Sequence, residues 1–103
     1  MLDNTFAALS DPTRRGILAL LAEREHSVGE LVDRFPITQS AVSRHLNVLE
    51  QATLIERRRE GQRRLCALRS EALVEVDRWM ERYRLMWDGK MRRLDRALKK
   101  TGR

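Results

Sequence analysis

The sequence predicts a mainly α-helical fold with one small β-hairpin and a long helix at the end of the chain. Three observations support this fold class. Helix-start signals precede short apolar segments in the first half of the chain, Gly61 separates two strand-like segments, and apolar residues recur every seven positions after residue 70. The length of 103 residues suits a single domain, 1–103, with one modest core.

The charge of the chain is positive and unevenly distributed. Lys and Arg number 21 against 15 Asp and Glu, which gives a net charge of +6. Residues 1–37 hold four Arg against six acids, whereas residues 38–69 hold seven Arg against three acids. A positive surface favours an anionic partner such as nucleic acid, although net charge alone serves solubility equally well. We therefore expect a positive surface that begins at Thr38.

Composition also argues against several other classes of protein. A single Cys and two His leave too few ligands for an intramolecular disulfide, a zinc ribbon or an iron–sulfur cluster. No apolar run approaches the roughly 20 residues that a membrane-spanning helix needs, and the N-terminal segment lacks the features of a secretory signal. We expect a cytoplasmic protein with no membrane partner.

Helix-start signals occur at three places in the first half of the chain. Asp11 precedes Pro12, and residues 27–30 (SVGE) have the pattern of a capping box. The short helix that starts there closes at the Phe-Pro pair of positions 35 and 36, and another helix begins almost at once, at about Thr38. Two helices joined by so short a turn predict a helix-turn-helix, in which residues 38–52 form the second helix, the recognition helix.

Helical spacing divides segment 38–52 between an apolar side and a polar side. The apolar side holds Ala41, Val42, Leu46, Val48, Leu49 and Ala52, with His45 among them as a packed, hydrogen-bonded imidazole. The polar side holds Gln39, Ser40, Ser43, Arg44 and Asn47. Amides, hydroxyls and a guanidinium on one face are suited to reading base edges in a major groove. An ordinary solvated surface is the alternative interpretation of this face.

Two strand-like segments, 54–59 and 63–69, flank the turn at Gly61. Five Arg lie within eight residues at the tip of this hairpin: Arg57, Arg58, Arg59, Arg63 and Arg64. This density favours contact with phosphates and makes the hairpin a wing beside the recognition helix. An edge strand kept soluble by its charge is the alternative.

Two single residues bear on the chemistry of the chain. Cys66 points inward in the second strand-like segment, where we expect a buried, unreactive thiol, with a redox switch as the alternative. His26 lies in a polar stretch beside Glu25 and is expected to be exposed to solvent.

Segment 70–100 is predicted to form the last helix, with Ser70 as its N-cap. A wide apolar stripe runs along it and includes Leu73, Trp79, Met80, Tyr83, Met86, Trp87 and Leu94. A helix of about 30 residues spans about 45 Å, more than one small core can cover. We expect a second copy of the chain to cover the aromatic face, so that this helix serves dimerisation.

Three segments resemble the ArsR family of bacterial winged-helix repressors, and together with the last helix they extend the resemblance over nearly the whole chain. They are residues 6–18, which begin FAALSDPTRR, residues 39–49, QSAVSRHLNVL, and residues 59–63, REGQR. The resemblance implies a winged helix-turn-helix with the order helix, helix, helix, helix, strand, strand, helix. It implies DNA contacts by Gln39, Ser40, Ser43 and Arg44, with Asn47 on the same face and Arg58, Arg59, Arg63 and Arg64 in the wing. It implies a dimer through the first and last helices, with Phe6, Leu9, Trp79, Tyr83, Met86, Trp87 and Leu94 at the interface.

The resemblance is to the metal-independent, autorepressor-like branch of that family. Metal sensors of the family have paired cysteines on the helix that here spans residues 28–34, and Asp, His and Glu ligands on the last helix. This chain has no Cys in the first segment and no His in the second, so we expect no metal and no cofactor. Family members also usually have Gly in a left-handed conformation after the recognition helix, where this chain has Thr53, a β-branched residue that would be strained there. We therefore expect a differently shaped end of this helix.

The function that these observations predict is sequence-specific binding of double-stranded DNA by a homodimeric repressor at a pseudo-palindromic operator. A winged-helix module that binds another protein instead of DNA is one alternative, and a redox-responsive repressor that uses Cys66 is another. An enzyme is the weakest alternative, because no nucleophile accompanies a plausible base and no glycine-rich phosphate loop is present. The sequence does not identify the effector.

Overall fold

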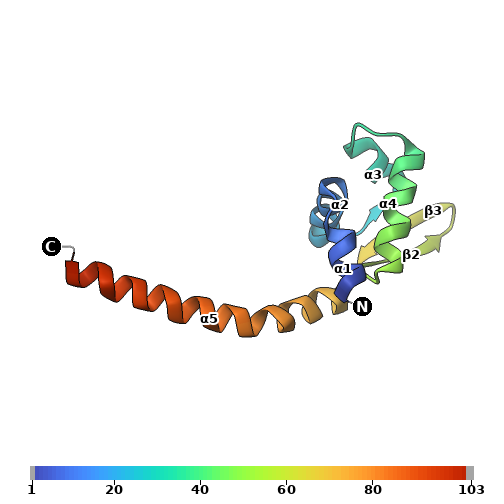
Figure 1. The fold of residues 1–103 in the computed structure, drawn as a ribbon. Helices are drawn as coiled ribbons and strands as arrows, with labels where there is room; N and C mark the ends of the chain where they lie inside the picture. Colours follow the sequence, from blue (N-terminus) through green and yellow to red (C-terminus); the bar gives the residue numbers. More distant parts are fainter. Residues whose placement is uncertain (1, 102–103) are drawn as a thin grey trace. The chain divides into compact units, whose positions relative to one another are not determined.

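The computed structural model describes residues 2–101, which follow the predicted order of elements with one additional strand (Figure 1). The elements are α1 (Leu2–Leu9), α2 (Pro12–Glu23), β1 (His26–Ser27), α3 (Val28–Arg34), α4 (Gln39–Gln51), β2 (Ile55–Glu60), β3 (Arg63–Leu68) and α5 (Glu71–Thr101). The mainly helical fold class with a small hairpin is therefore confirmed. The described chain divides into a unit that ends at Leu73 and a unit that begins at Val74, and the single domain 1–103 stays a prediction.

The three predicted helix starts are local hydrogen-bonding motifs. The carboxylate of Asp11 accepts a hydrogen bond from the backbone N–H of Arg14 (3.0 Å). The hydroxyl of Thr38 accepts one from an amide in the first turn of α4 (3.1 Å). The capping box is complete, because the hydroxyl of Ser27 and the carboxylate of Glu30 each accept the other residue's backbone N–H at 3.1 Å. These caps satisfy amides that would otherwise lack partners and set where α2, α3 and α4 begin.

The sheet has three antiparallel strands in the order β1-β3-β2, so the predicted hairpin is extended by one further strand. In β1, His26 lies opposite Cys66. The expectation that His26 is exposed was wrong: it is 4% exposed, and its Nδ1 donates to the backbone carbonyl of Arg24 (3.0 Å). A strand of two residues has no alternation to recognise, and it exists only because β3 offers it an edge.

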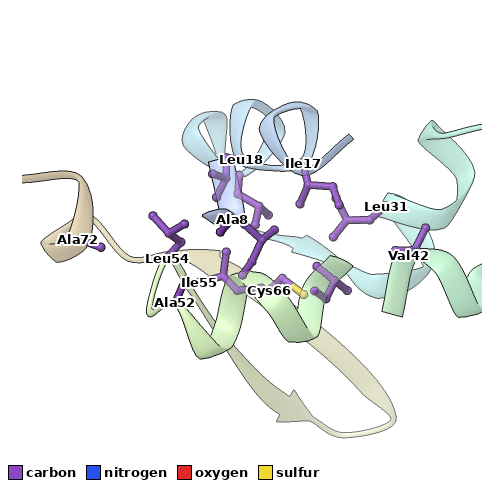
Figure 2. Close-up of a cluster of buried hydrophobic side chains, with 13 residues drawn as sticks. Ala8, Ile17, Leu18, Leu31, Val42, Ala52, Leu54, Ile55, Cys66 and Ala72 are labelled. Atoms are coloured by element: carbon purple, nitrogen blue, oxygen red, sulfur yellow. The ribbon is translucent and has the colours of Figure 1, made fainter. Parts of the chain in front are cut away.

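The core of the first unit gathers apolar side chains from α1 to α4 and from the sheet (Figure 2). The largest of the fully buried apolar side chains are Ile17, Leu31, Val42, Leu46, Leu49, Leu54 and Ile55. Each contributes about 1.5–3 kcal/mol through its removal from water. Cys66 is fully buried in the same cluster, and burial raises the pKa of its thiol, which disfavours the reactive thiolate. The expectation of a buried thiol is confirmed.

In the second unit, which is the part of α5 from Val74 onward, large apolar side chains are exposed. Their exposed fractions range from 41% at Trp79 to 62% at Trp87. The rings of Trp79 and Tyr83 lie with their centroids 5.1 Å apart and tilted by 52°. Within residues 2–101, no helix has an apolar stretch long enough to cross a membrane.

The end of α4 is closed by a left-handed residue that is not glycine. Thr53 has φ 57°, its N–H donates to the carbonyl of Glu50, and the N–H of Leu54 donates to the carbonyl of Leu49, both at 3.0 Å. This is the Schellman pattern, and the buried pair Leu49 and Leu54 supplies its usual apolar contact. The expectation of a differently shaped helix end was therefore wrong: Thr53 adopts the left-handed conformation even though β-branched residues disfavour it, because these hydrogen bonds impose it.

We predict that Thr53→Gly raises the free energy of unfolding by about 1 kcal/mol, because glycine adopts positive φ without a clash. Urea denaturation followed by circular dichroism measures the change. The opposite substitution, Gly61→Ala, serves as a control and should destabilise the hairpin, since Gly61 has φ 64°. An unchanged or lower stability of Thr53→Gly would show that the site is not strained.

Candidate nucleic-acid interface

One face of α4 packs on the core, and the other faces solvent. Val42, Leu46 and Leu49 are completely buried. Four of the five side chains predicted to read DNA are exposed and the fifth, Ser43, is half-buried; the exposed ones are Gln39, Ser40, Arg44 and Asn47. The prediction for Val48 was wrong, because it is 38% exposed. It lies about 100° around the helix from Leu49, at the margin of the buried side.

Arg14 connects α4 to the preceding helices. Its Nε donates to the carbonyl of Ala8 (2.7 Å), and its Nη2 donates to the carbonyl of Ala7 (3.2 Å), at the end of α1. Its Nη1 lies 3.3 Å from Nδ1 of His45 in α4, so the predicted packed, hydrogen-bonded imidazole is confirmed. The guanidinium of Arg14, a residue of α2, therefore connects α1, α2 and α4 and holds α4 against the two preceding helices.

The tip of the wing contains two facing arginines. Gly61, at φ 64°, forms the turn between β2 and β3, and the strand register places Arg59 directly opposite Arg64. Both side chains are exposed, and neither forms an ion pair with a carboxylate of residues 2–101. Like charges directly opposite each other destabilise a hairpin. A polyanion between them would remove that cost, so this pair is a candidate anion-binding element.

Two other predicted wing arginines are held by acids of the preceding segment. Arg58 makes a two-pronged pair with Glu25, both N–O distances being 2.7 Å, and lies 3.3 Å from Glu60. These contacts keep the pKa of Glu25 below its usual value. Arg63 lies 3.4 Å from the carboxylate of Glu30. The pairs connect the hairpin to Glu25, just before β1, and to Glu30 in α3.

An open hollow of ≈ 420 Å³ lies where the wing approaches the starts of α3 and α4. Its lining consists of Ser27, Val28, Gly29, Gln39, Gln62, Arg63 and Arg64. It thus brings predicted contact residues of the recognition helix and of the wing to one place. Two guanidinium groups and two amides make the hollow suitable for a phosphate of a nucleic-acid backbone.

Arg57 is a functional candidate outside the predicted set of DNA-contact residues. Its Nη2 donates to Oδ1 of Asn47 (2.6 Å) and to a carboxylate oxygen of Glu50 (2.7 Å). The alternation of strand side chains was the available signal, because Arg57 lies two positions from the buried Ile55 and therefore shares its face of β2. Arg57 connects the wing to the recognition helix. No cluster of three or more His, Cys, Asp or Glu suited to a metal ion occurs in the part of the chain that is described.

Comparison with known proteins finds relatives that are named as transcriptional regulators. A family model described as a helix-turn-helix domain matches residues 9–58. The transcriptional repressor SdpR of Bacillus subtilis is 39% identical over 79 residues, which cover 77% of this chain and 88% of SdpR. The HTH-type transcriptional regulator Rv2034 of Mycobacterium tuberculosis is 38% identical over 81 residues, 79% of this chain and 76% of that protein.

Solved structures agree with these relatives. The ArsR family transcriptional regulator RHA00566 matches with a TM-score of 0.77 at 31% identity, over 84% of this chain and 90% of its own. An ArsR-like transcriptional regulator from Rhodococcus sp. RHA1 matches with a TM-score of 0.73 at 34% identity, over 95% of this chain and 90% of its own.

The polar face of α4, the wing beside it and these relatives define a class of protein, the winged helix-turn-helix transcriptional regulators that bind DNA. Within that class, the overall match to described ArsR regulators extends over most of both chains. The chain belongs to the ArsR family, and the resemblance seen in its sequence is confirmed.

We predict that Glu30→Gln makes stability less sensitive to acid. The backbone N–H of Ser27 and the guanidinium of Arg24 lower the pKa of Glu30 from 4.5 to about 2. The folded state therefore binds fewer protons than the unfolded state. The stabilisation by Glu30 is complete above pH 4.5 and is lost as the pH falls to about 2.

Urea denaturation of both proteins at several pH values between 2 and 4.5 measures this effect, and the variant should lose less stability over that range. Glu56→Gln, which removes one carboxylate from an exposed position of β2, is the control. Parallel curves for Glu30→Gln and the unchanged protein would contradict the assignment.

Proposed function

We propose that the chain is a homodimeric repressor that binds a pseudo-palindromic operator, with the α4 helices of the two protomers in successive major grooves. The observation that supports it most is the hollow that Gln39 of α4 and Arg64 of the wing line together, Arg64 lying opposite Arg59 and neither arginine having a carboxylate partner among residues 2–101. A helix of this kind beside a basic hairpin suits a major groove flanked by phosphates. The relative SdpR is named a transcriptional repressor, which supports repression over activation.

The two parts of the interface have different tasks in this proposal. Gln39, Ser40, Ser43, Arg44 and Asn47 read base edges, while Arg58, Arg59, Arg63 and Arg64 hold the backbone. Phosphate contacts fix register without reading sequence, whereas base contacts give specificity. In this proposal the protein works in the cytoplasm. It has no catalytic activity and binds no metal or cofactor, because binding DNA requires neither.

We predict that Arg44→Ala costs about 1–3 kcal/mol of binding free energy on the operator and blurs preference at one base pair of each half-site. Arg64→Ala should instead weaken operator and scrambled DNA alike. It should also reduce the slope of log affinity against log salt concentration by about two per dimer, because each protomer loses one phosphate contact.

Binding isotherms at several salt concentrations measure both effects, on DNA selected from a genomic library and on a scrambled duplex. Arg96→Ala in α5 changes the charge by the same amount outside the first unit and serves as the control. A selective loss of operator preference in Arg64→Ala, with a uniform loss in Arg44→Ala, would reverse the assignment. Absence of any salt-sensitive, sequence-dependent binding would favour the protein-interaction module.

Dimer formation is proposed through α1 and α5. Of the residues predicted at the interface, Leu9 is half-buried and the others are exposed. Their exposed fractions are 39% for Phe6, 41% for Trp79, 48% for Tyr83, 57% for Met86, 62% for Trp87 and 51% for Leu94. So large an exposed aromatic stripe is typical of a surface that another protein covers. A second copy of the chain covers it with two-fold symmetry in this proposal.

We predict a dimer at micromolar concentration that Trp87→Glu converts to a folded monomer, because the side chain is 62% exposed and does not support the core. Sedimentation velocity and circular dichroism measure the two properties. Leu85→Glu is a matched control, since Leu85 is also 62% exposed but lies about 200° around the helix from Trp87. A monomeric parent protein, or equal effects of the two substitutions, would contradict the proposed interface.

A further inference from the structure

We propose that Arg57 sets the base preference of Asn47, so that Asn47 selects guanine or thymine and disfavours adenine. The inference rests on the proposed function, because it requires the outward face of α4 to lie in a major groove. It assigns to one wing residue a role in specificity, whereas the wing as a whole binds phosphates.

The contact between the two side chains fixes how the Asn47 amide is oriented. Nη2 of Arg57 lies 2.6 Å from Oδ1 of Asn47. A guanidinium can only donate hydrogen bonds, so the Asn47 atom that faces it must be the carbonyl oxygen and not the amide nitrogen. The interaction itself therefore decides between the two orientations of the amide.

A second contact holds Arg57 in place. The same Nη2 donates to the carboxylate of Glu50 (2.7 Å), which lies one turn after Asn47 on α4. Only 28% of the Arg57 side chain is exposed, and its hydrogen bond keeps the pKa of Glu50 below the usual value, so the carboxylate stays charged. An ion pair that also satisfies a neighbouring amide is more restrictive than either contact alone.

The remaining hydrogen-bonding capacity of Asn47 determines what it can read. Adenine is recognised when an Asn amide accepts from N6 and donates to N7 at the same time. In this structure one of the two lone pairs of Oδ1 of Asn47 accepts from the positively charged Arg57, so an adenine N6 donor would meet a partly occupied oxygen beside a positive charge, while both hydrogens on Nδ2 remain on an exposed residue. A side chain that presents donors matches the N7 and O6 acceptors of guanine and the O4 acceptor of thymine.

The neighbouring Arg58 provides a matched control. It carries the same charge one position along β2, but it points to the other side of the strand and pairs with Glu25. Replacing either arginine by Met removes one positive charge and keeps an unbranched side chain. Only the replacement at position 57 releases the Asn47 amide.

The experiment is selection of bound sequences from a random duplex library by the full chain and by Arg57→Met, Arg58→Met and Asn47→Ala. The unchanged protein should enrich guanine or thymine at one position of each half-site, and Asn47→Ala should flatten that position alone. Arg57→Met should increase the relative frequency of adenine there by about tenfold, which corresponds to about 1.4 kcal/mol. Arg58→Met should lower overall affinity and leave every base preference unchanged.

Several results would overturn the inference. The first is enrichment of adenine by the unchanged protein at the position that Asn47→Ala flattens. The second is a set of base preferences that stays the same in Asn47→Ala or in Arg57→Met. Glu50→Gln keeps the charge of Arg57 but weakens the ion pair that holds it, so it should shift the same position toward adenine to a smaller degree. This variant replaces Arg57→Met in the test if Arg57→Met does not fold. No enrichment by the unchanged protein would refute the proposed function and this inference together, whereas enrichment without an effect at position 57 refutes the inference alone.

Discussion

Burial of Val42, Leu46 and Leu49 fixes the rotation of α4 about its own axis, and the arrangement of the whole interface depends on it. A rotation by one residue would move the polar side chains by about 100° and turn an apolar one outward. The Schellman closure at Thr53 fixes where the helix stops, and the caps at Asp11, Ser27 and Thr38 fix where its neighbours and the helix itself begin. The orientation of the polar face of α4 is thus a result of core packing more than of any contact on that face.

The charge of the wing is less available than its composition suggests. Five arginines lie in the hairpin, but Arg57, Arg58 and Arg63 already have carboxylate partners, and only Arg59 and Arg64 have none among residues 2–101. The acidic partners are Glu25 just before β1, Glu30 on α3 and Glu50 on α4, while Arg59 and Arg64 remain available to an external anion. Structural rigidity and ligand attraction are therefore divided among neighbouring residues of one strand pair.

Features that depend on neighbours in sequence could be predicted, and features that depend on distant partners could not. The caps at Asp11, Ser27 and Thr38 and the turn at Gly61 are local, so their patterns were sufficient. The short strand at His26 forms because it pairs with β3, in which Cys66, 40 positions later in the sequence, lies opposite His26. No local sequence pattern predicts this strand.

The arginine partners show the same limit. Arg58 and Glu25 are separated by 33 positions, and only the folded chain brings them together. The contact between Arg57 and Asn47 spans 10 positions and two element types. The list of exposed polar residues on α4 could be written from helical spacing alone, but which of their atoms remain available could not.

Arg14 has a consequence for how this gene would respond to mutation. One guanidinium satisfies two carbonyls at the end of α1 and contacts His45 on α4, and a lysine, with a single nitrogen, cannot reach three such separate acceptors. Loss of these contacts would lower the stability of the first unit without changing the polar face of α4. In a cell, a stability loss of about 1–2 kcal/mol changes protein abundance several-fold through chaperones and proteases. An allele altered at position 14 would then resemble a reduced gene dosage, with the regulated promoters partly released and their sequence requirements intact.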